Sequence, residues 1–273
     1  MILYGSGRHG LVTAPDRPFH ESNHSLSLAF ADLILIAAVA FGAQVLGGVA
    51  GYGTGLIMPL ILVPLIGAEA VVPVIAMASL ITNPTRLITF WQYLDRRKAV
   101  ILSVVGIPTV MLGAFGFSLL GGKQAQLFIG AMLISLVPLR HLMKAVRLKL
   151  SDRGLAVSGF GYGLLMGGTT GSGVMLLSML MSAGLSGKAV IATDAAISTF
   201  LGLFKTGVFY SAGELPPSLW LVAILIGVMA TPGSLVAKWL ADRLSATSHW
   251  RRDTDKEVFG GLMLMVPPLL YQG

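Results

Sequence analysis

The sequence predicts an all-α integral membrane protein of about ten helical segments. Of its 273 residues, 55% are hydrophobic and only 11% are charged, whereas about 25% of the residues in an ordinary soluble domain are charged. A spanning helix takes about 20 residues, so the chain has room for about ten crossings and for no large soluble catalytic domain. The chain has no cysteine, which excludes disulfides and thiolate metal sites.

Ten apolar runs, taken in chain order, predict the helices. They lie near residues 28–50, 55–67, 70–93, 99–120, 124–146, 154–170, 173–184, 188–210, 216–240 and 257–272. The second and seventh runs are short, and each follows a glycine-rich break. At 1.5 Å per residue these two helices cover about 20 Å of a hydrocarbon core about 30 Å thick. We therefore expect two short, broken helices among the ten segments.

The basic residues of the loops test this count, because such residues collect on the cytoplasmic side of a membrane. With ten segments one face receives Arg96, Arg97, Lys98, Arg147, Lys149, Arg153, Lys188, Arg243, Arg251, Arg252 and Lys256. The other face receives Lys123, Glu214 and both termini. Without the two short runs, the loops at 96–98 and 251–256 would lie on opposite faces. The sequence thus predicts a multi-pass protein of the plasma (inner) membrane with both termini outside, and it assigns the net charge of +7 to loops instead of nucleic-acid binding.

The chain divides into four parts. We expect residues 1–27 to form a polar leader, either disordered or interfacial, and not a signal peptide, because no small-residue cleavage site follows the first apolar run. Residues 28–146 form a first membrane repeat, 147–153 a basic cytoplasmic linker, and 154–273 a second membrane repeat.

Short sequence matches relate the two repeats. Gly53-Thr54-Gly55 matches Gly171-Ser172-Gly173, and Val74-Ile75-Ala76 matches Val190-Ile191-Ala192. The matched runs are five segments apart, and an odd shift inverts the orientation in the membrane. Inverted-topology repeats with discontinuous helices are a device of secondary transporters, which bind substrate at the repeat interface.

The glycine-rich breaks are candidate anion sites. A helix N-terminus carries about half a positive charge and unpaired N–H groups, and glycine lets a ligand approach them. The candidate substrate-binding residues at the two breaks are Gly53, Thr54, Gly55, Gly171, Ser172 and Gly173. The alternative is that glycines spaced by four only allow close packing, in the series Gly159, Gly163, Gly167 and Gly171 and the series Gly47, Gly51 and Gly55.

Few ionisable residues lie deep inside the predicted helices, where each costs at least about 2.5 kcal/mol at the helix centre; Arg86, Asp194 and Lys205 are the candidates for a functional role. Arg86 and Lys205 occupy roughly equivalent positions in the two repeats, as expected for one cation per half that holds an anion. The alternative is snorkelling of these long side chains to the headgroups.

Asp194 lies at nearly the depth of Arg86, so the two are expected to pair. Such an acid either couples transport to protons or forms a structural ion pair. Ser198 and Lys205 lie on the same helical face as Asp194. Asn83 lies one turn before Arg86, and a kink at Pro84 is expected to aim both side chains at one cavity; the alternative is a kink without functional meaning. We include Asn83 and Ser198 among the candidate substrate-binding residues.

The runs Gly51–Leu60 and Gly167–Gly173 resemble the two glycine-rich motifs of the sulfite exporter TauE/SafE family. The resemblance covers residues 33–272. It implies transport of a small anion, such as sulfite, a sulfonate or a related organosulfur anion.

Several activities are disfavoured by what the sequence lacks. All five histidines lie outside the predicted helix cores, and the chain has neither an HExxH motif nor a P-loop. We expect a transporter and not an enzyme, with no cofactor and no metal. Its expected partners are a small anion, the lipid bilayer and protons as a candidate coupling ion; the oligomeric state stays open. The alternatives are an anion channel and a structural membrane protein without substrate.

Overall fold

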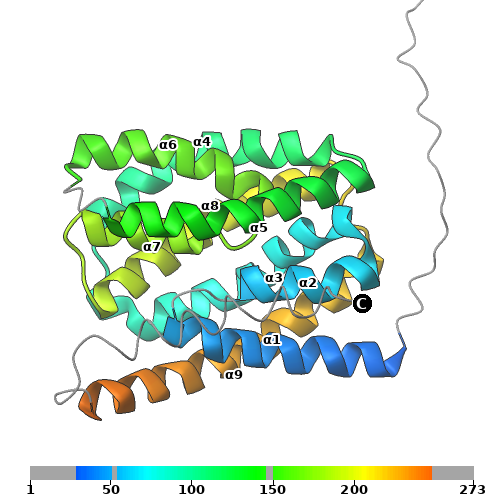
Figure 1. The fold of residues 1–273 in the computed structure, drawn as a ribbon, viewed down its shortest axis with the longest axis horizontal. Helices are drawn as coiled ribbons and strands as arrows, with labels where there is room; N and C mark the ends of the chain where they lie inside the picture. The colour runs from blue at the N-terminus through cyan, green and yellow to red at the C-terminus, as the bar shows by residue number, and fades with distance from the viewer. Residues whose placement is uncertain (1–28, 51–53, 146–149, 248–273) are drawn as a thin grey trace, which may run out of the picture.

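The computed structural model describes residues 29–50, 54–145 and 150–247, and every regular element in these ranges is a helix (Figure 1). The elements are α1 (Phe30–Ala50), α2 (Thr54–Ile66), α3 (Ala68–Phe90), η1 (Trp91–Tyr93), α4 (Arg96–Ser118), α5 (Gly122–Ala145), α6 (Asp152–Gly168), α7 (Gly173–Ser182), α8 (Lys188–Ser211) and α9 (Pro217–Thr247). This confirms the all-α prediction, and each of the first nine predicted segments coincides with a helix. The tenth segment, the leader and Gly53 lie outside the described residues.

Among the described residues, four helical stretches are long and apolar enough to cross a membrane. They are Ala68–Tyr93, Arg96–Ser118, Lys188–Ser211 and Pro217–Ala237. The two helices predicted to be short are so, since α2 has 13 residues and α7 has 10. Large apolar side chains also cover the outside of the bundle, as at Ile88 and Val157, which are 76% and 77% exposed. Such a surface suits lipid and not water.

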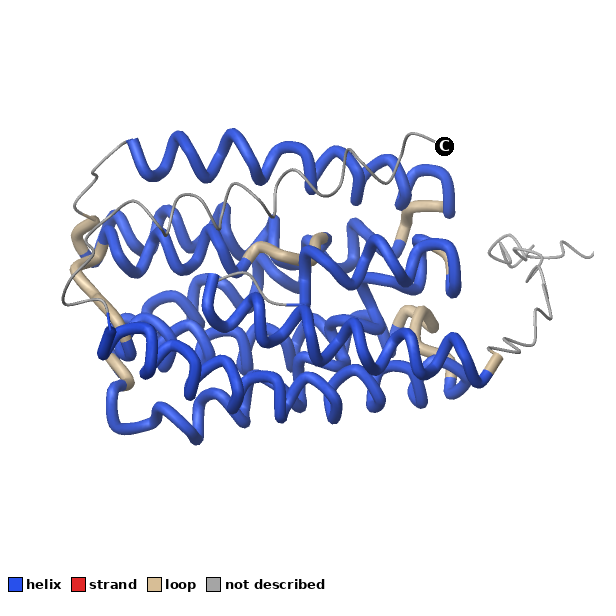
Figure 2. The backbone as a smooth tube through the Cα atoms, turned by 60° about the horizontal axis from the view of Figure 1, so that its bottom comes forward, coloured by secondary structure: helices blue, strands red, loops and turns tan. Residues whose placement is uncertain are grey.

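The helices lie side by side in a bundle with α3 and α8 against each other at its centre (Figures 1 and 2). Helix α9 packs between α3 and α1 at one edge, and α4 packs between α8 and α6 at the other edge. Two apolar cores result. One includes Val72, Phe117 and Phe209, and the other includes Leu102, Tyr162 and Leu201.

Glycines allow α6 to pack backbone to backbone against α4. A Cβ atom added to Gly163 would lie 3.0 Å from Gly106 Cα, and one added to Gly167 would lie 2.7 Å from Gly113 Cα. A Cβ atom added to Gly159 would lie 2.7 Å from the side chain of Leu102. The packing interpretation of this glycine series therefore fits its first three members.

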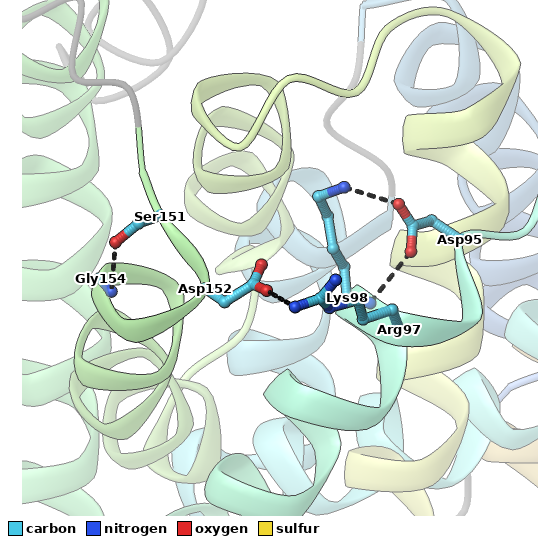
Figure 3. A network of polar contacts seen from close by, with 6 residues as sticks. All are labelled: Asp95, Arg97, Lys98, Ser151, Asp152 and Gly154. Carbon is cyan, nitrogen blue, oxygen red and sulfur yellow. Dashed lines mark hydrogen bonds and ion pairs between the residues drawn. The ribbon is translucent and has the colours of Figure 1, made fainter.

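A polar network surrounds the start of α4, and Figure 3 shows its residues on α4 and at the start of α6. Asp95 caps α4, because its Oδ1 accepts a hydrogen bond from the Lys98 backbone N–H at 3.0 Å. Its Oδ2 lies 2.6 Å from Lys98 Nζ, and its own N–H donates to Thr193 Oγ1 on α8. Arg97 pairs with Asp152, in the first turn of α6, at 2.5 Å. The network thus ties α4 to both α6 and α8.

Removal of the Asp95 cap is expected to destabilise the protein in a pH-dependent way. Partial burial alone would raise the pKa of Asp95, but the hydrogen bonds and charge of Lys98 outweigh it and hold the pKa below its usual value. Because its pKa is lower in the folded protein than in the unfolded chain, ionised Asp95 stabilises the folded state at pH values above the ordinary pKa of aspartate. This stabilisation is lost as the pH falls through the lowered pKa. Asp95→Ala should therefore cost about 1 kcal/mol at neutral pH. The unfolding temperatures of the wild type and of Asp95→Ala, measured against pH, check this prediction. A difference between the two proteins that stays constant into the acid range would contradict it.

Candidate functional site

The two glycine-rich breaks meet inside the bundle. A Cβ atom added to Gly55, the second residue of α2, would lie 2.5 Å from the backbone nitrogen of Gly171 and 2.9 Å from its Cα. Gly171 has a φ of 80°, in the left-handed region that favours glycine. The N-terminal end of α2 therefore lies directly against the break that precedes α7. The side chain of Thr54 lies outside the described part of the chain.

The start of α7 carries groups suited to an anion. Ser172 is its N-cap residue and is buried, but its side chain makes no capping hydrogen bond. The Ser172 carbonyl accepts hydrogen bonds from the N–H groups of Met175 and Leu176. A Cβ atom added to Gly173 would meet no atom within 4 Å. Within the described residues, the α7 N-terminus thus has a hydroxyl that does not cap the helix, N–H groups without an intrahelical partner, and no neighbouring atom at the Cβ position of Gly173.

Arg86 and Asp194 form an ion pair between the two central helices, as expected from their depth. Arg86 Nη2 of α3 lies 3.0 Å from Asp194 Oδ2 of α8. The Asp194 side chain is 5% exposed and that of Arg86 is 24% exposed. Asp194 Oδ1 is buried and has no hydrogen-bond partner in the described residues. The pair therefore satisfies only half of the carboxylate.

Lys205 binds the C-terminal end of α6. Its ammonium group donates hydrogen bonds to the carbonyls of Met166, at 2.7 Å, and Thr169, at 2.8 Å. Lys205 is 5% exposed, so it does not snorkel to the surface. A cation at this position also complements the negative end of the helix dipole. Lys205 thereby fixes α8 to the chain two residues before Gly171.

Tyr162 of α6 completes the cluster, and the sequence interpretation did not include it. Its side chain is buried, and its hydroxyl group lies close to the side chains of Ser172, Ser198 and Asp194. No atom in the described residues meets hydrogen-bond geometry with that hydroxyl. The available signal was a polar group in the middle of an apolar helix, since a buried tyrosine hydroxyl usually has a partner.

The structure therefore brings together most of the predicted residues. Ser172 and Ser198 both lie close to the Tyr162 hydroxyl. Asp194 also lies close to that hydroxyl and pairs with Arg86. Gly55 lies against Gly171. Asn83 is half-buried on α3, and the described part of the chain records no hydrogen bond or ion pair for it. The described residues also contain no group of three or more histidine or acidic side chains that would hold a metal ion.

The charges of this cluster favour an anion. The pair of Arg86 with Asp194 is neutral when both are ionised. Lys205 adds one positive charge further along α8, at the C-terminal end of α6, and the N-terminal ends of α2 and α7 add partial positive charge. Burial strengthens these interactions, because little water is present to screen them. These positive groups are ones that a small anionic ligand would use.

One of the comparisons with known proteins finds a match. No curated protein and no solved structure matches the chain. The family model of the sulfite exporter TauE/SafE, a family of membrane transporters, matches residues 36–252, which is most of the chain. The apolar helices and this match together indicate a multi-pass membrane protein. The chain belongs to the sulfite exporter TauE/SafE family.

Proposed function

We propose that this protein is a secondary transporter that carries a small anion across the plasma membrane by alternating access. Sulfite, another organosulfur anion or an organic acid anion is the proposed substrate. The observation that carries the proposal is the buried cluster in which Ser172, Tyr162, Asp194 and Arg86 come together at the start of α7. The family membership supports transport as the activity.

The pattern of helix contacts supports two inverted repeats. Helix α1 packs against α9 and α2, and five elements later α6 packs against α4 and α7. Likewise α3 packs against α9 and α2, while α8 packs against α4 and α7. Each contact of α1 or α3 thus has a counterpart between the helices whose numbers differ by five. The contact of Gly55 with Gly171 then joins the two repeats, where transporters of this kind bind substrate.

The ion pair suggests how an anion would be coupled to protons. An anion that binds Arg86 displaces Asp194 from the guanidinium group. The carboxylate is then left buried without a counter-charge, which is costly, so it takes up a proton. Release of the anion restores the pair of Arg86 with Asp194 and expels the proton. Transport of the anion with a proton follows from this exchange.

Flux into vesicles that contain the purified protein tests the proposed function. We expect saturable, proton-coupled uptake of one or more of sulfite, sulfate, thiosulfate, sulfoacetate and acetate. Arg86→Ala should reduce the apparent affinity about 10-fold to 100-fold, since a hydrogen bond to a charged group contributes about 1.5–3 kcal/mol. Arg153→Ala is the matched control, because Arg153 is exposed at the start of α6.

Other outcomes would assign another function. Flux that neither saturates nor moves protons would indicate an anion channel. Absence of both flux and thermal stabilisation with every anion would indicate a structural membrane protein, since a ligand that binds only the folded state raises its stability.

A further inference from the structure

Buried polar atoms without a partner are rare in proteins, and each requires an explanation. In the described residues these atoms are Ser103 Oγ, Tyr162 Oη, Asp194 Oδ1 and Thr206 Oγ1. Two of them, on Tyr162 and Asp194, belong to the same cluster and interact with each other electrostatically. The cluster at the start of α7 therefore contains two of the four buried polar atoms that have no hydrogen-bond partner in the described residues.

Most polar groups of this cluster, with or without a partner, can donate hydrogen bonds. Hydroxyl groups arrive from three elements: Tyr162 from α6, Ser172 from the N-cap of α7 and Ser198 from α8. The orphan N–H groups of the first turn of α7 add further donors. The acceptor left over in the same place is one carboxylate oxygen, on Asp194. A ligand that balances this set must bring acceptor atoms.

We propose that the Tyr162 hydroxyl is a ligand of the transported anion and donates a hydrogen bond to one of its oxygen atoms. Ser172, Ser198 and the α7 N-terminus bind the remaining oxygens, and Arg86 supplies the charge. This inference rests on the proposed function and adds to it the residue that sets selectivity. The consequence is a preference for anions with several acceptor oxygens over monatomic anions.

The geometry explains this preference. The donors come from three different helices, so they approach the site from different directions. An oxyanion presents separate oxygen atoms, each with its own lone pairs, to such a set of donors. A halide presents one centre and no separate oxygen atoms, so in this proposal Arg86 and the α7 N-terminus hold it without the Tyr162 hydroxyl. Loss of the Tyr162 donor should therefore weaken oxyanion binding and leave halide binding unchanged.

Thermal stabilisation of the full-length protein in detergent provides the test. The probes are sulfite, sulfate, thiosulfate and sulfoacetate, with bromide as the monatomic anion. Tyr162→Phe removes only the hydroxyl group. We expect this variant to bind the oxyanion that stabilises the wild type with about tenfold lower affinity, so that about tenfold more of the oxyanion is needed for the same rise in unfolding temperature. The response to bromide should not change. Tyr210→Phe is the matched control, because Tyr210 is 63% exposed near the end of α8.

The outcomes separate this inference from the proposed function. Equal oxyanion binding by wild type and Tyr162→Phe would overturn the inference and leave the proposed function intact. That result would mean that water, not substrate, meets the hydroxyl. Absence of any oxyanion response in the wild type would overturn both. If Tyr162→Phe does not fold, Ser172→Ala serves in its place and should show the same selective loss.

Discussion

Gly167→Ala is expected to destabilise the protein by about 3 kcal/mol or more, although it adds a single methyl group. The new Cβ atom would lie 2.5 Å from the backbone nitrogen of Ala114 and 2.7 Å from Gly113 Cα, and it would clash with the Val110 carbonyl oxygen. All of these are backbone atoms, so no side chain can move aside. Helices α4 and α6 must separate to accept the change, and they form one edge of the bundle.

Gly161→Ala is the matched control for this prediction. Gly161 lies on the same helix, and a Cβ atom added there meets nothing within 4 Å. Alanine favours a helix by about 0.8–1.0 kcal/mol over glycine, so Gly161→Ala should stabilise the protein slightly. Thermal unfolding of both variants, followed by tryptophan fluorescence, checks the opposite signs. Similar unfolding temperatures would show that α4 and α6 are not in backbone contact at Gly167.

Arg86→Leu is expected to destabilise the protein more than Asp194→Leu. Removal of one member of a buried ion pair costs about 3–5 kcal/mol, because the other charge is left without a partner. Arg86→Leu leaves Asp194 alone, and the Asp194 side chain is only 5% exposed. Asp194→Leu leaves Arg86, which is 24% exposed and partly reaches solvent or headgroups. The double variant should be more stable than Arg86→Leu, because it leaves neither charge unpaired.

Transport by the double variant then separates the two roles of the pair. If Arg86 holds the anion, the double variant stays inactive although it is stable. If the pair only fixes α3 to α8, the double variant transports as the wild type does. Unfolding temperatures and flux must therefore be measured on the same preparations. Equal losses of stability in both single variants would contradict the burial difference on which the prediction depends.

The sequence is sufficient to predict much of this architecture. Long apolar runs predict helices in lipid, since every backbone group must find a partner within its own segment. The glycine breaks predict where two of those helices become short. The depth of Arg86 and Asp194 in their helices predicts that they pair, because an unpaired charge there is costly.

Other features of the site depend on geometry that the sequence does not specify. Lys205 binds two backbone carbonyls, and carbonyls carry no residue-specific signal. Tyr162 reaches Ser172 only because of the rotation of α6 about its own axis, which its close packing against α4 sets. The spacing of Gly159, Gly163 and Gly167 does not distinguish packing from ligand binding. In the structure these three glycines pack against α4, whereas Gly171, the fourth of the series, lies against Gly55.

The contact between the two breaks also constrains how the protein is made. Gly55 and Gly171 are 116 residues apart in the chain (171 minus 55). The ribosome therefore synthesises the first break long before the second one. Until then the break at Gly55 has no protein cover on the side that Gly171 later occupies, and an uncovered backbone group in hydrocarbon is unfavourable. The break at Gly55 therefore gains its final backbone neighbour only when the segment that precedes α7 has been made.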